Sequence, residues 1–177
     1  MRWLYRVAMP ILVVIVVAFV YQRLFGDEAA APHLVSSRPV AVIGSGSEAV
    51  AVAEDGTVLA WFPLPEEGGL PELPLSEPPK AGRLAGPALD QVRILAATPA
   101  PLRPYVAGSS YGERGVDVEL STGIELRFGA ATQAARKWRA AAAVLANPSL
   151  TALDYVNVSV PARPSVGGSG HALPPIS

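Results

Sequence analysis

Residues 116–128 read VDVELSTGIELRF, and this stretch decides the fold class. Aliphatic residues alternate with acids in 116–120, and apolar residues alternate with charged ones in 124–128. A period of two is typical of strands with one buried face. A three-residue loop, 121–123, brings both buried faces to the same side and gives Gly123 the left-handed position. The expected cross-strand pairs are Leu120–Ile124, Asp117–Arg127 and Glu119–Glu125.

Three more strands are expected within residues 38–61. Residues 38–43 (RPVAVI) read as a strand with proline at its start, where the missing N–H is tolerated. Residues 49–53 and 57–61 flank Asp55-Gly56, a hairpin signal. The proline-rich stretch 62–79 is expected to be a surface loop that cannot join a ladder.

Two helices and one late strand complete the expected domain. Residues 87–97 and 131–145 have apolar residues at helical spacing. The second helix is expected to bury Ala131, Ala134, Ala135, Trp138, Ala141, Ala142 and Leu145. Its basic residues Arg136, Lys137 and Arg139 are assigned to a solvated face, with contact to acidic lipid or a partner as the alternative. Residues 155–160 read as a strand with Val156, Val158 and Val160 inward, and 165–177 as a disordered tail.

The N-terminal residues predict a membrane anchor. Val7 to Gln22 contains no charged residue, and flanking apolar and aromatic residues extend the segment to 7–25. Arg2 and Arg6 keep the tail 1–6 in the cytoplasm, so the rest of the chain is exported. A cleavable signal peptide ending near Ala29–Ala31 is the alternative, but the run is long for a signal and Pro32 would follow the cut.

The predicted organisation is therefore a cytoplasmic tail, an anchor and one exported α+β domain, with a mixed or antiparallel sheet and two packed helices. The predicted boundaries are 1–6 for the tail, 7–25 for the transmembrane anchor, 26–37 for a linker, 38–166 for the domain and 167–177 for a disordered tail.

The composition excludes several function classes. The 177 residues include no cysteine and two histidines, which removes disulfides, thiolate nucleophiles and cysteine-ligated zinc. The 14 basic and 15 acidic residues give a net charge of −1, too little positive charge for nucleic-acid binding. Gly44–Ser47 lacks the third glycine of a phosphate-binding motif, and no nucleophile, acid or base cluster emerges. We therefore expect no enzyme activity, no cofactor and no metal.

Three blocks of the sequence, taken in order, share a pattern with a known family: RPVAV at 38–42 with DGTV at 55–58 and LPEL at 70–73, VELSTGIELRFG at 118–129, and YVNVSVPARP at 155–164. Together they resemble the bacterial cell division family FtsQ/DivIB. The resemblance covers about residues 38–166, plus the anchor by topology. Asn157 stands where the family usually carries aspartate, and too few residues separate the anchor from Arg38 for the family's POTRA domain.

The resemblance implies a non-catalytic scaffold of the divisome. It would be a single-pass type II protein of the bacterial inner membrane at the division septum. Such a protein recruits or holds partners of the FtsB/DivIC and FtsL type during septum formation. In the family, the last strand of the β domain accepts a partner strand, and an arginine shortly before the strand at 116–120 faces an acid on the partner. The partner-binding residues implied here are Arg114, Val158, Ser159, Val160, Arg163, Ser165 and Val166.

Two alternatives stay open from the residues alone. One is an anchored, exported binding module unrelated to division, which diffuse membrane localisation would distinguish from a septal protein. The other is an anchored hydrolase, which would need acid, base or nucleophile residues clustered around a pocket. Pro161 and Pro164 each remove an N–H donor, so any ladder with a partner along 158–166 must be interrupted.

Overall fold

A computed structural model describes residues 38–64 and 69–175. They belong to the second of two units into which the chain divides, Ser37–Ser177. Its elements in chain order are β1 (Pro39–Ile43), η1 (Gly46–Glu48), β2 (Val50–Ala53), β3 (Val58–Leu59), β4 (Glu72–Leu73), α2 (Gly86–Ala96), η2 (Ala100–Tyr105), β5 (Val106–Gly112), β6 (Gly115–Leu120), β7 (Glu125–Gly129), α3 (Ala134–Leu145), β8 (Ala152–Asn157) and β9 (Ser165–Ala172).

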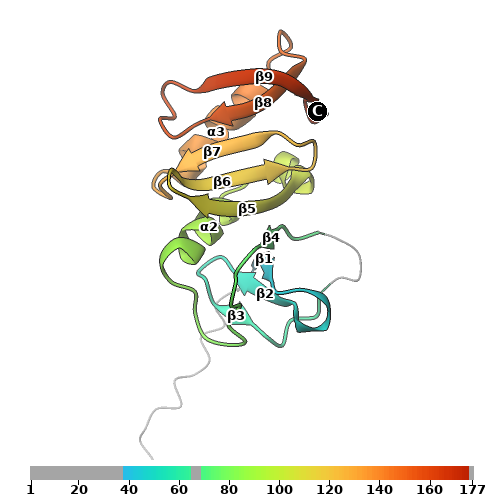
Figure 1. The fold of residues 1–177 in the computed structure, drawn as a ribbon, viewed down its shortest axis with the longest axis vertical. Coiled ribbons are helices and arrows are strands. Elements are labelled where there is room, and N and C mark those ends of the chain that lie inside the picture. Colours follow the sequence, from blue (N-terminus) through green and yellow to red (C-terminus); the bar gives the residue numbers. More distant parts are fainter. Residues whose placement is uncertain (1–37, 65–68, 176–177) are drawn as a thin grey trace, which may run out of the picture. The chain divides into compact units, whose positions relative to one another are not determined.

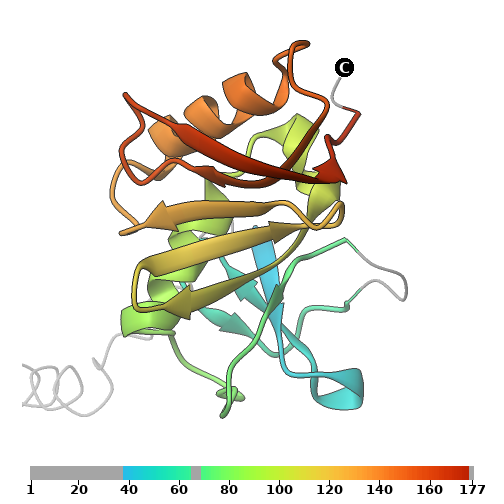
Figure 2. The same cartoon turned by 45° about the horizontal axis from the view of Figure 1, so that its top comes forward.

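The strands form one nine-stranded mixed sheet in the order β3-β2-β1-β4-β5-β6-β7-β8-β9 (Figure 1). β4 runs parallel to both β1 and β5, and β7 runs parallel to β8, whereas the other neighbours are antiparallel. α2 and α3 lie against one face of this sheet (Figure 2). The other face of the central strands carries the charged residues of β6 and β7, so the main core lies between sheet and helices. The expected α+β class is confirmed.

The β6–β7 hairpin has the predicted register. Asp117 lies opposite Arg127, and Glu119 opposite Glu125. The Leu120 N–H donates to the Ile124 carbonyl at 3.0 Å and closes the three-residue loop. Gly123 has a φ of +92°, the conformation that glycine adopts without steric cost.

α3 packs on the sheet through Trp138, as predicted. The indole is fully buried, its ring centroid is 4.8 Å from that of Phe128, and its Nε1 donates to the Ile94 carbonyl at 2.7 Å. The helix begins at Ala134 rather than Ala131, because Gln133 has left-handed backbone angles. Ala135, expected on the buried stripe, is exposed.

The predicted solvated position of Lys137 is wrong. This side chain is only 3% exposed, and its Nζ donates to the carbonyls of Phe128 at 2.9 Å and Ala130 at 2.7 Å. A long apolar stem lets lysine cross a buried surface and deliver its ammonium group to polar partners. Lys137 therefore binds the carbonyls at the end of β7, whereas Arg136 and Arg139 are exposed as expected.

The proline-rich stretch 62–79 is not wholly a loop. It contains β4, which lies between β1 and β5 and joins the two parts of the sheet. Pro71 and Pro74 flank β4 but remove donors only at their own positions, and the Val42 N–H donates to the Pro71 carbonyl at 3.0 Å. β5 was not expected either, because Gly108, Ser109 and Ser110 have low strand propensity. The predicted strand 57–61 is also shorter, and Trp61 lies outside it.

The C-terminal prediction needs the largest correction. The predicted strand 155–160 is β8, which ends at Asn157, and Val160 is 57% exposed rather than inward. The predicted disordered tail 167–177 is instead mostly β9, paired antiparallel with β8. Beyond β9, Tyr105 Oη donates to the Pro175 carbonyl at 3.2 Å. The strand Val158–Val160 is thus absent, and a later strand covers β8.

The predicted tail, anchor and linker, 1–37, lie outside the described residues. Within 38–64 and 69–175, every helix is too short or too polar to cross a membrane.

Candidate partner-binding edge

The two ends of the sheet differ in length and in cover. β3 has two residues, and the segment 82–84 covers its outer side: Val58 N–H donates to the Gly82 carbonyl and Leu84 N–H to the Gly56 carbonyl, both at 2.8 Å. β9 has eight residues, and within the part of the chain that the structure describes no strand pairs with its outer side. We call this outer side of Ser165–Ala172 the β9 edge. Its residues are exposed or half-buried.

Side chains of β8 hold this glycine-rich strand in place. The Asp154 Oδ1 accepts the Gly170 N–H at 2.7 Å, and the same carboxylate occupies the place that a side chain at Gly168 would need. A side chain at Gly167 would meet the Tyr155 ring at 2.6 Å. Gly168 has a φ of +77°. The absence of side chains at these glycines therefore lets the Asp154 and Tyr155 side chains lie directly against the backbone of β9.

A line of contacts on the open face of the sheet connects β9 to the central strands. The Tyr155 ring lies beside Gly167, and the Arg127 guanidinium lies 3.8 Å from the centre of that ring, a cation–π contact. Arg127 Nε donates to the Glu125 carboxylate, and this bond raises the pKa of Arg127. A continuous series of side-chain contacts thus connects Glu125 and Arg127 of β7, through Tyr155 of β8, to the backbone of β9.

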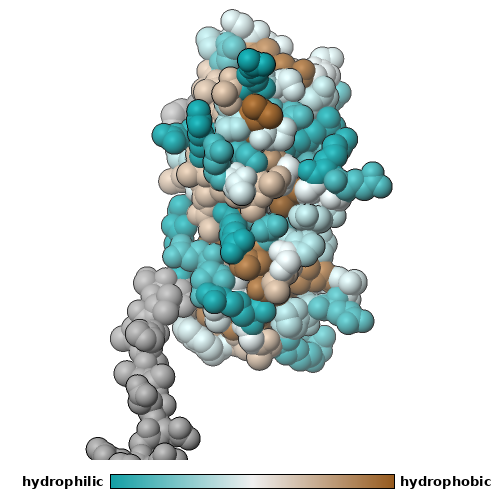
Figure 3. Space-filling view, turned by 90° about the vertical axis from the view of Figure 1, so that its left-hand side faces the viewer, coloured by the Kyte–Doolittle hydropathy of each residue, from teal (hydrophilic) through white to brown (hydrophobic). Residues whose placement is uncertain are grey.

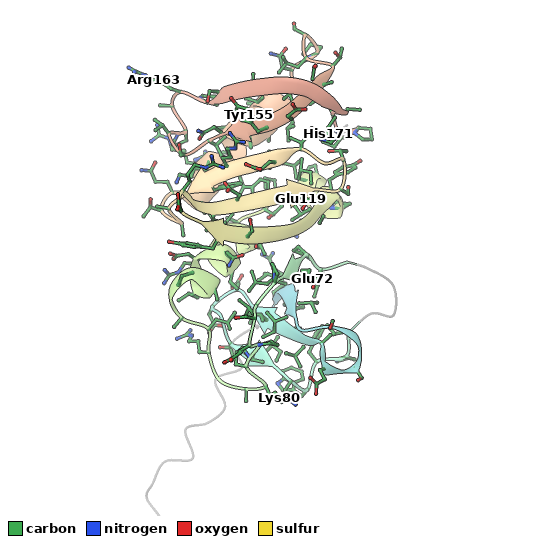
Figure 4. The ribbon with its side chains drawn as sticks, viewed as in Figure 1. Glu72, Lys80, Glu119, Tyr155, Arg163 and His171 are labelled. Atoms are coloured by element: carbon green, nitrogen blue, oxygen red, sulfur yellow. The ribbon has the colours of Figure 1, made fainter. Side chains whose placement is uncertain are left out.

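The far end of β9 contacts the β6–β7 loop. A side chain at Gly123 would collide with the imidazole of His171, whose Nδ1 would lie 2.5 Å away. Figure 4 shows His171 and Arg163 at opposite ends of the β8–β9 pair, with Tyr155 between them. One end of β9 therefore contacts the β6–β7 loop through His171, and the other end follows the loop that contains Arg163.

The loop 158–164 holds four of the predicted partner-binding residues. Val158 is fully buried, and its N–H donates to the Arg127 carbonyl at 2.9 Å, so its role is structural. The Ser159 N–H and Oγ both bond the Asn157 Oδ1, at 3.0 and 2.7 Å. This Asx turn ends β8 and turns the chain away from the ladder. Val160 and Arg163 are exposed at the tip of the loop.

Arg114 directly precedes β6 and lies near the loop 158–164, which follows β8, but it is not next to β9. It occupies the β5–β6 turn, and a Cβ at Gly129 would lie 3.4 Å from the Arg114 carbonyl oxygen and 3.3 Å from the Ser159 Cβ. The Arg114 side chain is 68% exposed and within 4.0 Å of Asp117 and 3.8 Å of Glu125. The structure therefore brings Arg114 close to Ser159, whereas β7 and β8 lie between β6 and the strand β9 that contains Ser165 and Val166.

The open face also has an acidic hollow across β4 to β7. Its volume is about 620 Å³, and its lining includes Gly108 and Gly123 together with the acids Glu72, Asp117, Glu119 and Glu125. Burial, followed by repulsion from Glu125, raises the pKa of Asp117, and one oxygen of that carboxylate has no hydrogen-bond partner within the described part. Among residues 38–64 and 69–175, no group of three or more histidine or acidic side chains is arranged to hold a metal ion.

Sequence reasoning missed the residues that create the β9 edge. Ser165 and Val166 were named as partner contacts, whereas Asp154, Tyr155 and His171 were not. The available signal was the glycine-rich run at 167–170, because glycine within a strand often marks a place where another group approaches the backbone closely. No family model matches this chain, and no curated protein matches it at a significant level.

Proposed function

We propose that this chain is a membrane-anchored, non-catalytic scaffold of the FtsQ/DivIB type, which holds FtsB/DivIC- and FtsL-type partners during septum formation. The anchor is residues 7–25, the N-terminus is cytoplasmic, and the described domain is exported. The support from the sequence is the three-block resemblance behind one apolar segment. The support from the structure is the open β9 edge.

The β9 edge is the observation that carries the proposal. An edge strand presents unpaired N–H and C=O groups, and an extended segment of a partner can complete the ladder. Natural sheets usually protect such edges with charges, proline or covering segments, but Ser165–Ala172 contains neither an acid nor a lysine, arginine or proline. Three of its residues are glycine, so a partner backbone can approach closely.

Because the last strand is β9 rather than 158–160, the proposed hydrogen-bonding ladder with the partner lies at Ser165–Ala172. Ser165 and Val166 lie in the ladder itself, whereas Val160 and Arg163 lie on the loop at its start. Val158 supports the loop from the core and does not meet the partner. Arg114 is a positive charge near the loop 158–164, suited to steering an acidic partner segment toward the β9 edge.

Proline substitution tests the ladder without deleting the strand. N–H groups along a strand point alternately to the two sides, so Ser165→Pro and Val166→Pro remove one donor that faces β8 and one that faces outward. The inward variant should lower the stability of the domain. The outward variant should keep the melting temperature and weaken binding of the partner's exported segment in calorimetry.

The comparison between the two variants decides the mechanism. If neither variant loses affinity at unchanged stability, strand addition at β9 is wrong. Truncation after Pro164 removes β9 and should abolish binding. Arg114→Glu should lower the affinity more at low salt than at high salt, as expected for a rim charge. A fluorescent fusion spread evenly over the membrane, rather than gathered at the septum, would favour the unrelated binding module.

A further inference from the structure

Trp61 is the most exposed large hydrophobic side chain among the described residues. It is 76% exposed, whereas Val160, Tyr111 and Val166 range from 57% down to 40%. On the face that Figure 3 shows, hydrophobic residues form small patches separated by hydrophilic ones, which is ordinary for a water-facing surface. A nearly free indole is different, because tryptophan carries a large apolar area together with one N–H donor.

The chain on either side of Trp61 is packed against the domain. The Phe62 N–H donates to the Leu59 carbonyl at 3.0 Å and closes a turn directly after β3. Phe62 and Leu64 pack on a small second core of Ala51, Ala53 and Leu59. The Trp61 and Phe62 rings meet edge to face, with centroids 6.2 Å apart. Trp61 therefore projects from a packed base rather than from a loose loop.

The charges near this end of the sheet are paired. Lys80 Nζ lies 3.1 Å from Glu48, Arg83 Nη2 lies 2.6 Å from Asp55, and Arg38 Nη2 lies 3.8 Å from Glu54. The sequence also places Glu66 and Glu67 a few residues after Trp61. Within 38–64 and 69–175, the basic residues Arg38, Lys80 and Arg83 thus have acidic partners, which leaves them no excess positive charge to attract an anionic surface. A contact made by Trp61 must therefore be apolar and interfacial.

The length of the linker limits how far this end can lie from the membrane. Residues 26–37 separate the proposed anchor from Arg38, the residue before β1. Twelve extended residues span at most about 40 Å. β1, β2 and β3 adjoin one another at this end of the sheet. The linker therefore sets an upper limit on the distance between Arg38 and the proposed anchor, and this limit raises the effective concentration of the domain at the lipid surface.

From the exposed indole, its packed base, the paired charges and the short tether, we propose that Trp61 inserts into the headgroup region of the bilayer that the chain's own N-terminal segment spans. This inference rests on the proposed anchor, but not on the proposed partner. Tryptophan is enriched at membrane interfaces because its ring suits the boundary between headgroups and acyl chains. The preferred surface is one of zwitterionic phospholipid.

The contact would set the orientation of the β9 edge. β3 and β9 are the two ends of the sheet. Neighbouring strands lie about 4.8 Å apart, so β9 lies roughly 40 Å from β3 along the sheet. A domain held to lipid only at Trp61 can therefore place the β9 edge as far as this distance from the membrane surface. It would meet a partner segment that extends outward from its own anchor.

Quenching by brominated lipid tests the proposal on the full chain. The protein is prepared in phosphatidylcholine nanodiscs with Trp3→Phe, which leaves Trp61 and Trp138 as the fluorophores. Trp138 is fully buried and out of reach of lipid. We expect brominated acyl chains to remove most of the Trp61 emission. The additional change Trp61→Phe should leave a weaker emission that bromination does not alter.

Each alternative has a distinct result. Unchanged Trp61 emission in brominated nanodiscs, with strong quenching by aqueous acrylamide, overturns the proposal. Shielding that develops only after the partner's exported segment is added would assign Trp61 to a protein contact instead, and also overturns it. A chain that does not remain with the nanodiscs overturns both the anchor and the tethered contact. Quenching that persists while the β9 edge fails to bind a partner supports the lipid contact and rejects the docking proposal.

Discussion

Replacing Trp138 with alanine should lower the free energy of unfolding by about 3–5 kcal/mol, the usual range for truncating a large core aromatic. The side chain is fully buried between α3 and the sheet. A buried aromatic removes roughly 150–250 Å² from water, and about 25 cal/mol per Å² converts this area into an upper bound of about 4–6 kcal/mol. Partial relaxation of the cavity lowers the expected value into the stated range.

A second variant separates packing from hydrogen bonding. Trp138→Phe keeps a ring against Phe128 but removes the N–H that donates to the Ile94 carbonyl. That carbonyl still accepts the Ala97 N–H at 3.1 Å, so it does not become unsatisfied. We therefore expect an intermediate loss of about 1–2 kcal/mol.

Urea denaturation of the unit Ser37–Ser177, followed by circular dichroism, measures these losses without depending on indole fluorescence. Arg136→Ala is the matched control, because Arg136 is exposed on the same helix. It should change the free energy of unfolding by well under about 1 kcal/mol. Similar small losses for Trp138→Ala and Arg136→Ala would refute the assignment of Trp138 to the core.

Three further predictions concern titratable groups, and urea melts at several pH values test each of them. Asp55 accepts bonds from Thr57 and Arg83 that lower its pKa, so Asp55→Ala should cost about 1 kcal/mol at neutral pH, and this cost should shrink as the pH falls below 3.8. Burial raises the pKa of Asp117, so Asp117→Asn should stabilise the domain at neutral pH and have no effect once the pH is below 3.8. A loss of stability in this variant at neutral pH would contradict the prediction. Burial lowers the pKa of Lys137, so the stability of the wild-type domain should rise as the pH approaches 10.5 from below. Lys137→Met should abolish that rise. The same variant should lower the free energy of unfolding by about 1–3 kcal/mol, because it removes the donor that binds two carbonyls.

The sequence predicted the elements whose local pattern and tertiary environment agree. In residues 116–128 the period of two, the loop length and the glycine all indicate one hairpin, and the structure has that register. The apolar spacing of 87–97 and 131–145 likewise identified both helices to within a few residues. Trp138 was placed in the core because it stands in the middle of the longest such stripe.

The missed elements are those stabilised by contacts distant in the sequence. β4 has two residues between prolines, and it is a strand because β1 and β5 lie on either side. β9 has a composition typical of a flexible linker, and it is a strand because Asp154 and Tyr155 lie over its glycines. Lys137 was assigned to solvent because sequence patterns treat charge as exposure, whereas two carbonyls at the end of β7 bind its ammonium group. Local propensity contains none of this information.

The unequal treatment of the two sheet edges is the strongest physical argument that β9 is built to be paired. A domain that only needed to be stable and monomeric would protect both ends of its sheet. This chain protects β3 through the segment 82–84, although β3 has only two residues. It leaves the eight residues of β9 open and gives them no acid, lysine or arginine, yet Asp154 and Tyr155 of the neighbouring strand hold them in place. An edge that its neighbouring strand already holds in an extended conformation, and that carries no acid, lysine or arginine, is preorganised for strand addition, because binding then costs little free energy for ordering the edge.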